Sequence, residues 1–280
     1  MTGRLDGGPA PGRAARGGLF MSDAATLERR GSVALITLNR PDAMNAVDSA
    51  LSRAVGAALE QLAEDPQLRV GVITGAGRAF CAGADLKALA AGQNIGDPEH
   101  PEYGFAGLVQ HFVDKPLIAA VNGFALGGGT EIVLACDLAV MSDQASLGLP
   151  EVKRGLVAAA GGLLRLPRQI PHKIALEMAL TGAPVDAETA ARWGLVNRVV
   201  PADQVLAVAL ELAETIAANA PLAVRASKRI IHRAAAFGSD WDAPIWQMNM
   251  EQTMPVFLSK DAAEGPRAFA EKRAPQWRGE

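Results

Sequence analysis

The pattern of apolar and polar positions predicts alternating strands and helices in the N-terminal half of the chain. Val33 to Leu38 is a short β-rich run, and Pro41 follows it as a strand terminator. Asp48 or Ser49 then caps a predicted helix that has one buried stripe. The stripe consists of apolar residues three or four positions apart, namely Leu51, Val55, Leu59 and Leu62.

Two further runs, Val70 to Thr74 and Leu117 to Val121, are almost wholly apolar. Such runs are expected of strands that are covered on both faces. The glycines at 127–129 interrupt the pattern, a helix is predicted from Thr130 to Cys136, and another apolar run extends from Leu138 to Met141. This order predicts a layered α/β fold.

Helical patterns dominate after Gly161. Asp186 caps a predicted helix that ends at Gly194, and Asp203 caps another. We therefore divide the chain into an arm at 1–20, an α/β core at 21–215 and a helical segment at 216–280.

Composition narrows the class of partner. The chain has 280 residues, a net charge of −3 and no long run of basic residues, which argues against nucleic acid and anionic membranes as partners. Residues 1–20 are rich in Gly, Pro, Ala and Arg, and we expect a disordered arm without a secretory signal or a transmembrane span. Residues 90–107 predict a mobile loop beside a pocket for a small soluble substrate.

The cysteines and histidines predict no metal site. Cys81 and Cys136 each lie in an apolar stretch, which favours buried thiols over a disulfide and fits a reducing, cytoplasmic compartment. The four histidines show no spacing typical of metal ligands. We expect neither a metal nor a redox cofactor.

Thr74 to Gly77 follow a predicted strand and look like the start of a dinucleotide-binding loop. The short-chain dehydrogenase pattern, however, needs glycine at positions 79 and 81, where this chain has Ala79 and Cys81. Its Tyr-x-x-x-Lys pair is also missing, because Tyr103 is followed four residues later by Gly107. We therefore reject an oxidoreductase.

Cys81 to Leu86 form a loop of small residues that lets the backbone approach a ligand closely. Asp85 is placed to cap the helix predicted after it. The alternative interpretation is an ordinary glycine turn that binds nothing.

Three glycines, Gly127 to Gly129, lead directly into a predicted helix. Backbone N–H groups at a helix N-terminus are unpaired and lie at the positive end of the helix dipole, so they suit a developing negative charge. Glu131 falls in the first turn of this helix. Its alternative role is to complement the dipole, which contributes about 0.3 to 1 kcal/mol.

Glu151 follows Pro150 in a largely apolar segment. Apolar surroundings raise the pKa of a carboxyl group and make it available as a proton donor near neutral pH. The alternative is a glutamate that only starts a helix.

Together these segments resemble the crotonase family, the enoyl-CoA hydratases and isomerases. The resemblance rests on Cys-Ala-Gly-Ala-Asp-Leu, Asn-Gly-Phe-Ala-Leu-Gly-Gly-Gly-Thr-Glu and Leu-Pro-Glu-Val, which occur in family order at family separation, and it extends from about Leu27 to the C-terminus. It implies that Ala84 and Gly128 donate the N–H groups of an oxyanion hole and that Glu131 and Glu151 are the two catalytic glutamates.

The resemblance also implies acyl-CoA as the substrate and a set of residues that contact it. These residues are Ala82, Ala84, Asp85, Leu86, Lys87, Gly128, Phe269 and Lys272. Phe269 and Lys272 match residues of the closing helix that approach the ligand of a neighbouring subunit, and the alternative is a solvated amphipathic helix. The implied fold is a spiral of β-β-α turns with a helical C-terminal trimerisation segment, assembled as a homotrimer or a dimer of trimers.

Both glutamates favour hydration over isomerisation, so the leading hypothesis is reversible syn hydration of a 2-enoyl-CoA to a 3-hydroxyacyl-CoA. One departure concerns residues 157–167, which lack the Pro-Gly-x-Gly-Gly of ordinary fatty-acid hydratases. With Arg192 to Gly194 and Ala268 to Arg273, they look closer to the carnitinyl-CoA dehydratase branch, which leaves the acyl group open. The alternatives are carnitinyl-CoA dehydration, isomerisation of a 3-enoyl-CoA, and a non-catalytic acyl-CoA binder.

Overall fold

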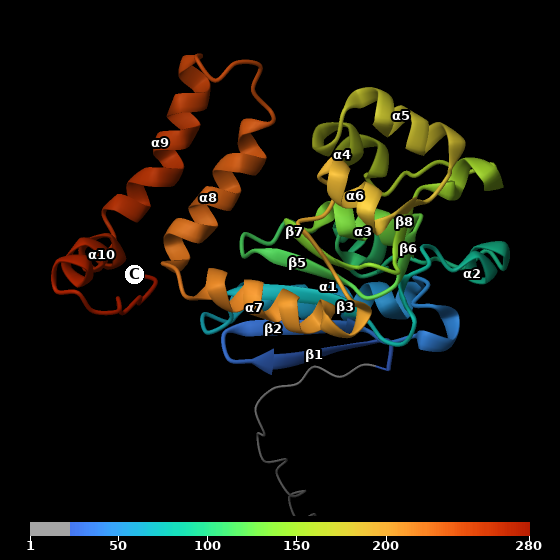
Figure 1. Cartoon of the computed structure of the whole chain (residues 1–280), viewed down its shortest axis with the longest axis horizontal. Helices are drawn as coiled ribbons and strands as arrows, with labels where there is room; N and C mark the ends of the chain where they lie inside the picture. Colours follow the sequence, from blue (N-terminus) through green and yellow to red (C-terminus); the bar gives the residue numbers. More distant parts are fainter. Residues whose placement is uncertain (1–22) are drawn as a thin grey trace, which may run out of the picture.

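The computed structural model describes residues 23–280. The arm predicted at residues 1–20 lies outside the described residues. Two β-sheets form the body, and helices cover their faces (Figure 1).

The larger sheet has six strands in the order β1-β2-β3-β5-β7-β10. β1 and β2 pair antiparallel, and every other pair in this sheet is parallel. The predicted apolar runs are central strands here, as their two-sided burial requires. The bounds are β1 Ala25–Arg30, β2 Val33–Leu38, β3 Val70–Gly75, β5 Leu117–Val121, β7 Leu138–Ser142 and β10 Arg198–Val200.

The smaller sheet has four strands in the order β4-β6-β8-β9, with bounds β4 Ala79–Cys81, β6 Phe124–Leu126, β8 Ser146–Gly148 and β9 Val185–Asp186. Each of three successive turns sends one strand to the larger sheet and the next to the smaller sheet, and a helix follows. The turns are β3-β4-α2, β5-β6-α3 and β7-β8-α4, with α2 Leu86–Ala90, α3 Gly128–Ala135 and α4 Gly162–Gln169. This arrangement confirms the predicted spiral of β-β-α turns.

Two long helices cover opposite faces of the larger sheet. α1 (Ser49–Glu64) begins at Asp48, whose side chain accepts a hydrogen bond from the Leu51 N–H, and the predicted stripe is buried. α7 (Val205–Ala217) packs its small residues against β3, β5 and β7. The predicted cap of this helix was wrong: Asp203 lies in a preceding 3-10 turn, and the N-cap residue is Gln204.

The remaining helices form two groups. α5 (His172–Thr181) and α6 (Ala187–Trp193) stay with the body, and Asp186 caps α6 as predicted. The C-terminal helices, which we call the helical arm, lie at the left of Figure 1, apart from α4 and α5 at the upper right. They are α8 (Pro221–Ala234), α9 (Ala243–Phe257) and α10 (Lys260–Ala270). The boundary predicted at 215/216 falls inside the last turn of α7.

Both cysteines are buried as free thiols, as the sequence predicts, and the compartment stays a prediction. Residues 90–107 contain two short 3-10 helices, Pro101–Tyr103 and Phe105–Gly107. Within residues 23–280, no single helix is long and apolar enough to span a membrane. One pair bent by 107°, Ala202–Ala217 with Pro221–Ala234, meets the length and composition criteria together.

Candidate active site

Three loops meet at one edge of the smaller sheet. β4 and β8 each pair with β6 in parallel, so the carboxyl ends of the three strands lie side by side. Residues 82–85 follow β4, residues 127–128 follow β6, and residues 149–151 follow β8. The three chemically suggestive segments of the sequence are therefore brought together by strand pairing.

The first loop presents an unpaired backbone N–H. The Val47 N–H donates to the Gly83 oxygen over 2.8 Å, and the Asp85 N–H donates to the Val47 oxygen over 2.9 Å. This parallel bridge directs the N–H of the intervening Ala84 away from Val47. The Ala84 N–H has no acceptor among residues 23–280. Gly83 has φ of +92°, which favours glycine.

Asp85 fixes the start of α2. Its carboxylate accepts hydrogen bonds from the Lys87 and Ala88 N–H groups at 3.1 and 3.2 Å and forms an ion pair with Arg40 at 3.1 Å. Leu86 and Lys87 are exposed on this short helix. The exposed first turn thus continues outward from the Ala84 loop.

The second loop approaches the first closely. A Cβ atom on Gly83 would lie 2.7 Å from the Leu126 oxygen and 3.1 Å from the Gly128 nitrogen, so the close approach of the two loops favours glycine at this position. Gly128 is the first residue of α3, and its N–H has no acceptor in the described chain. A Cβ atom on Gly128 would lie 2.3 Å from the Phe105 ring. Two free N–H groups, from Ala84 and Gly128, therefore lie on adjacent loops at the same sheet edge.

Glu131 lies in the first turn of α3, as predicted, and is only 3% exposed. Its Oε1 accepts a hydrogen bond of 2.8 Å from the Gly162 N–H. Burial and, to a smaller extent, the charge of Glu151 raise the pKa of Glu131 to about 6, against the opposing effect of the Gly162 hydrogen bond. The two carboxyl groups are thus close enough to interact.

Glu151 lies in a 3-10 helix, Pro150–Arg154, directly after β8. Its Oε2 is buried and has no hydrogen-bond partner within the described residues. Its Oε1 would be 3.1 Å from a Cβ atom on Gly127. Burial raises the pKa of Glu151. A half-buried carboxyl with a free oxygen therefore faces the start of α3.

Thr130 links the two glutamate segments. Its buried hydroxyl contacts the Ala125 oxygen at 2.7 Å and both the oxygen and the N–H of Gly148 at 2.9 Å. The Gly127 N–H also donates to the Gly148 oxygen over 2.8 Å. These bonds fix the start of α3 relative to the loop that carries Glu151.

Comparison with known proteins shows the family to which the chain belongs. The sequence pattern of the enoyl-CoA hydratase/isomerase family matches residues 28–280. The chain belongs to this family, the crotonases. It is 47% identical to a carnitinyl-CoA dehydratase of Proteus mirabilis over 92% of this chain and all of that protein.

Solved structures of enoyl-CoA and carnitinyl-CoA hydratases have the same fold as this chain. An enoyl-CoA hydratase from Mycobacterium tuberculosis H37Rv is similar with a TM-score of 0.87 and 47% identity, over 92% of this chain and all of that one. A carnitinyl-CoA hydratase from Mycobacterium avium is similar with a TM-score of 0.73 and 55% identity, over 93% of this chain and all of that one.

The other residues that the sequence of this crotonase predicts to contact acyl-CoA do not all present free groups at this sheet edge. The Ala82 N–H donates to the Met44 oxygen over 3.0 Å, so it serves the fold. Phe269, which is 88% exposed, lies in the last turn of α10, and Lys272 lies two residues beyond the end of this helix. Figure 1 shows α10 at the far left and α3, which carries Glu131, in the right half of the view, so one chain does not bring these two residues to Glu131.

The sequence interpretation missed several residues that form the site. Gly162 donates to Glu131, Phe105 covers Gly128, and Arg165 lies close enough for its charge to act on Glu131. Gly162 and Arg165 lie in the segment at 157–167 that differs from ordinary hydratases, so this difference in sequence could have pointed to them. Phe105 stands in the segment predicted as a loop and had no such signal.

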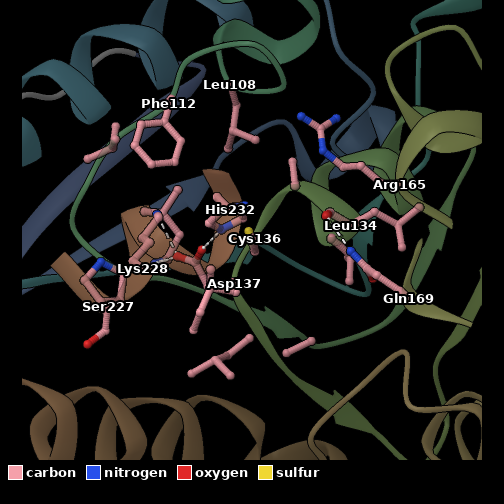
Figure 2. Close-up of a pocket in the computed structure, with 18 of the residues that line it drawn as sticks. Leu108, Phe112, Leu134, Cys136, Asp137, Arg165, Gln169, Ser227, Lys228 and His232 are labelled. Atoms are coloured by element: carbon pink, nitrogen blue, oxygen red, sulfur yellow. Dashed lines mark hydrogen bonds and ion pairs between the residues drawn. The ribbon is translucent and has the colours of Figure 1, made fainter. Parts of the chain in front are cut away.

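A separate cavity of about 1080 Å³ lies between α8 and the body (Figure 2). Asp137 on its wall pairs with Lys228 at 2.7 Å and with His232 at 2.9 Å. Neither Glu131 nor Glu151 lines it. In the described part of the chain, no three His, Cys, Asp or Glu side chains are grouped to hold a metal ion.

The raised pKa of Glu131 predicts a pH-dependent stability difference between wild type and Glu131→Gln. The folded protein holds the proton more tightly than the unfolded chain, so wild-type stability falls as pH rises from about 4.5 to about 6. The variant lacks this loss, and its free energy of unfolding relative to wild type should rise by about 2 kcal/mol across the window.

Urea unfolding at a series of pH values measures this difference. Glu188→Gln, on the exposed face of α6, is the matched control and should run parallel to wild type. Parallel curves for Glu131→Gln as well would show that Glu131 titrates normally.

Proposed function

We propose that this member of the crotonase family catalyses the reversible syn addition of water to a 2-enoyl-CoA thioester, giving a 3-hydroxyacyl-CoA. The main support is that one buried carboxyl group, one half-buried carboxyl group and two unpaired backbone N–H groups lie at one edge of the smaller sheet. Membership of the enoyl-CoA hydratase/isomerase family supports a CoA thioester as the substrate.

The backbone N–H groups of Ala84 and Gly128 stabilise the thioester oxygen in this proposal. That oxygen gains negative charge as water attacks C3, and preorganised donors stabilise such charge; removing one typically costs about 10²- to 10³-fold in rate. Gly128 also lies at the N-terminus of α3, where the helix dipole favours negative charge.

The two glutamates divide the proton transfers. Glu131, with a pKa of about 6, is mostly ionised at neutral pH and accepts a proton from the attacking water. Glu151, whose pKa burial raises, delivers a proton to C2. The water oxygen bonds to C3, so one hydroxyl and one hydrogen are added. The proposal assigns no metal or redox cofactor, and CoA is part of the substrate.

We expect Glu131→Gln and Glu151→Gln each to lower the hydration kcat by about 10²- to 10⁴-fold, with little change in acyl-CoA affinity. Glutamine keeps the shape of the side chain but neither accepts nor delivers the proton. The double variant should lose much less than the product of the single losses, because both groups act on one water.

Stopped-flow or steady-state hydration of crotonyl-CoA measures these rates, with Glu188→Gln as the control. Near-normal hydration by Glu131→Gln would reject the two-carboxylate mechanism and leave Glu151 as a lone proton shuttle suited to isomerisation. Acyl-CoA binding without turnover by wild type would indicate a non-catalytic binder.

A second candidate is the same chemistry on a carnitinyl-CoA thioester. Relatives at 46–47% identity that bear the name carnitinyl-CoA dehydratase support it. Product analysis with crotonyl-CoA, crotonobetainyl-CoA and a 3-enoyl-CoA separates the candidates. We expect water addition to the two 2-enoyl thioesters and no isomerisation of the third. A much higher kcat/KM for crotonobetainyl-CoA would select the second candidate.

We also propose assembly as a homotrimer or a dimer of trimers. The helical arm exposes large apolar side chains, a feature typical of surfaces that bind another chain. They include Trp246, Met250, Phe257 and Phe269. In such an assembly Phe269 and Lys272 approach the substrate of a neighbouring subunit. Light scattering at micromolar concentration should give three or six times the 29.1 kDa chain mass, and a stable monomer would contradict the proposal.

A further inference from the structure

Arg165 is a half-buried cation without an acidic partner. It lies in α4, and no carboxylate of residues 23–280 is within ion-pair distance of it. Figure 2 shows its guanidinium at the edge of the large cavity, on the far side from Asp137 and Lys228. Burial lowers the pKa of Arg165. A buried cation is costly unless its contacts compensate, so the groups that it contacts are informative.

One contact is the turn that holds Glu131. Arg165 Nη1 lies 3.5 Å from the Ala160 oxygen, and a Cβ atom on Gly161 would be only 2.1 Å from Nη1. The guanidinium therefore lies directly against the Gly161 backbone. The next N–H, that of Gly162, donates to Glu131 Oε1 over 2.8 Å. The peptide between Gly161 and Gly162, which orients the proposed base, therefore lies next to the guanidinium.

The other contact is the loop that covers the oxyanion glycine. Arg165 Nη2 donates to the Val109 oxygen, and the Val109 N–H donates to the Phe105 oxygen over 3.2 Å. The Phe105 ring lies over Gly128. Arg165 thus joins the wall beside Glu131 to the wall beside Gly128.

We propose that Arg165 is a positioning residue for the reaction, because its one guanidinium links the Gly162 turn that orients Glu131 to the Phe105 loop that covers Gly128 and places a positive charge beside Glu131. The charged groups that act on Glu131 are Glu151, which raises its pKa, and Arg165, which lowers it. The charges that act on Arg165 are those of Glu131, which raises its pKa, and Arg168, which lowers it; the Cys136 thiol is neutral because burial raises its pKa to about 12. The kinetic part of this proposal rests on the proposed function.

The test uses Arg165→Met, Arg165→Lys and the control Arg168→Met, whose side chain is exposed one turn further along α4. We expect Arg165→Met to lower the crotonyl-CoA hydration kcat by about 10²-fold, the usual cost of a misplaced catalytic group. The acid limb of its pH profile should move to higher pH, because Glu131 loses a stabilising positive charge. Arg165→Lys should lose rate but keep the wild-type acid limb, and Arg168→Met should match wild type.

Two further measurements separate this proposal from the proposed function. Isotope-edited infrared titration of the Glu131 carboxyl, assigned by its loss in Glu131→Gln, needs no turnover and should give a higher pKa in Arg165→Met. Added guanidinium should partly restore the rate of Arg165→Ala. If Arg165→Met has the wild-type rate, the wild-type acid limb and the wild-type pKa of Glu131, the proposed role of Arg165 is wrong. A wild-type rate in Glu131→Gln would instead overturn the proposed function. If Arg165→Met does not fold, the Arg165→Lys profile decides.

Discussion

The site depends on the parallel pairing of three very short strands. β4, β6 and β8 are three residues each, and pairing through β6 places their carboxyl ends at one sheet edge. Ala84, Gly128 and Glu151 follow these ends within three residues. The chain between these strands passes through helices, through the larger sheet and through residues 91–116, which contain only two short 3-10 helices. Residues far apart in sequence meet at the sheet edge because the strands themselves are paired.

Bringing the loops together requires glycine at positions where any side chain would collide. A Cβ atom on Gly129 would lie 2.1 Å from the Cys81 oxygen, and one on Gly83 would lie 2.7 Å from the Leu126 oxygen. At these contacts the backbones of neighbouring loops lie in close approach. The N–H groups of Ala84 and Gly128 have no hydrogen-bond acceptor among residues 23–280. Burial of Glu131 and Glu151 beside them costs free energy, which the Gly162 hydrogen bond offsets only in part. Unpaired polar groups are retained in a stable fold where function requires them.

Local patterns predicted the regular elements and the loops that carry chemistry. Val33–Leu38 and the Asp48-capped helix α1 match because burial and capping are local properties that a few residues encode. The sequence did not predict β6, and the predicted Asp203 cap was wrong, since a three-residue strand and the choice of cap depend on tertiary packing. The contacts of Phe105 and Arg165 could not be predicted, because each joins segments whose proximity only the fold defines.

The same reasoning explains why the motifs leave the acyl group open. The proposed oxyanion donors are main-chain atoms, so the glycine-rich motifs encode only how closely two backbones approach. Two relatives at 47% identity, one named carnitinyl-CoA dehydratase and one enoyl-CoA hydratase, are compatible with that common scaffold. Acyl selectivity must then come from side chains around it. The Phe105 loop and the segment at 157–165 form the walls next to Gly128 and Glu131, and Arg165 joins them. We therefore expect residues that differ among crotonases on these two walls to determine which thioester is accepted, while the three strand ends determine the reaction.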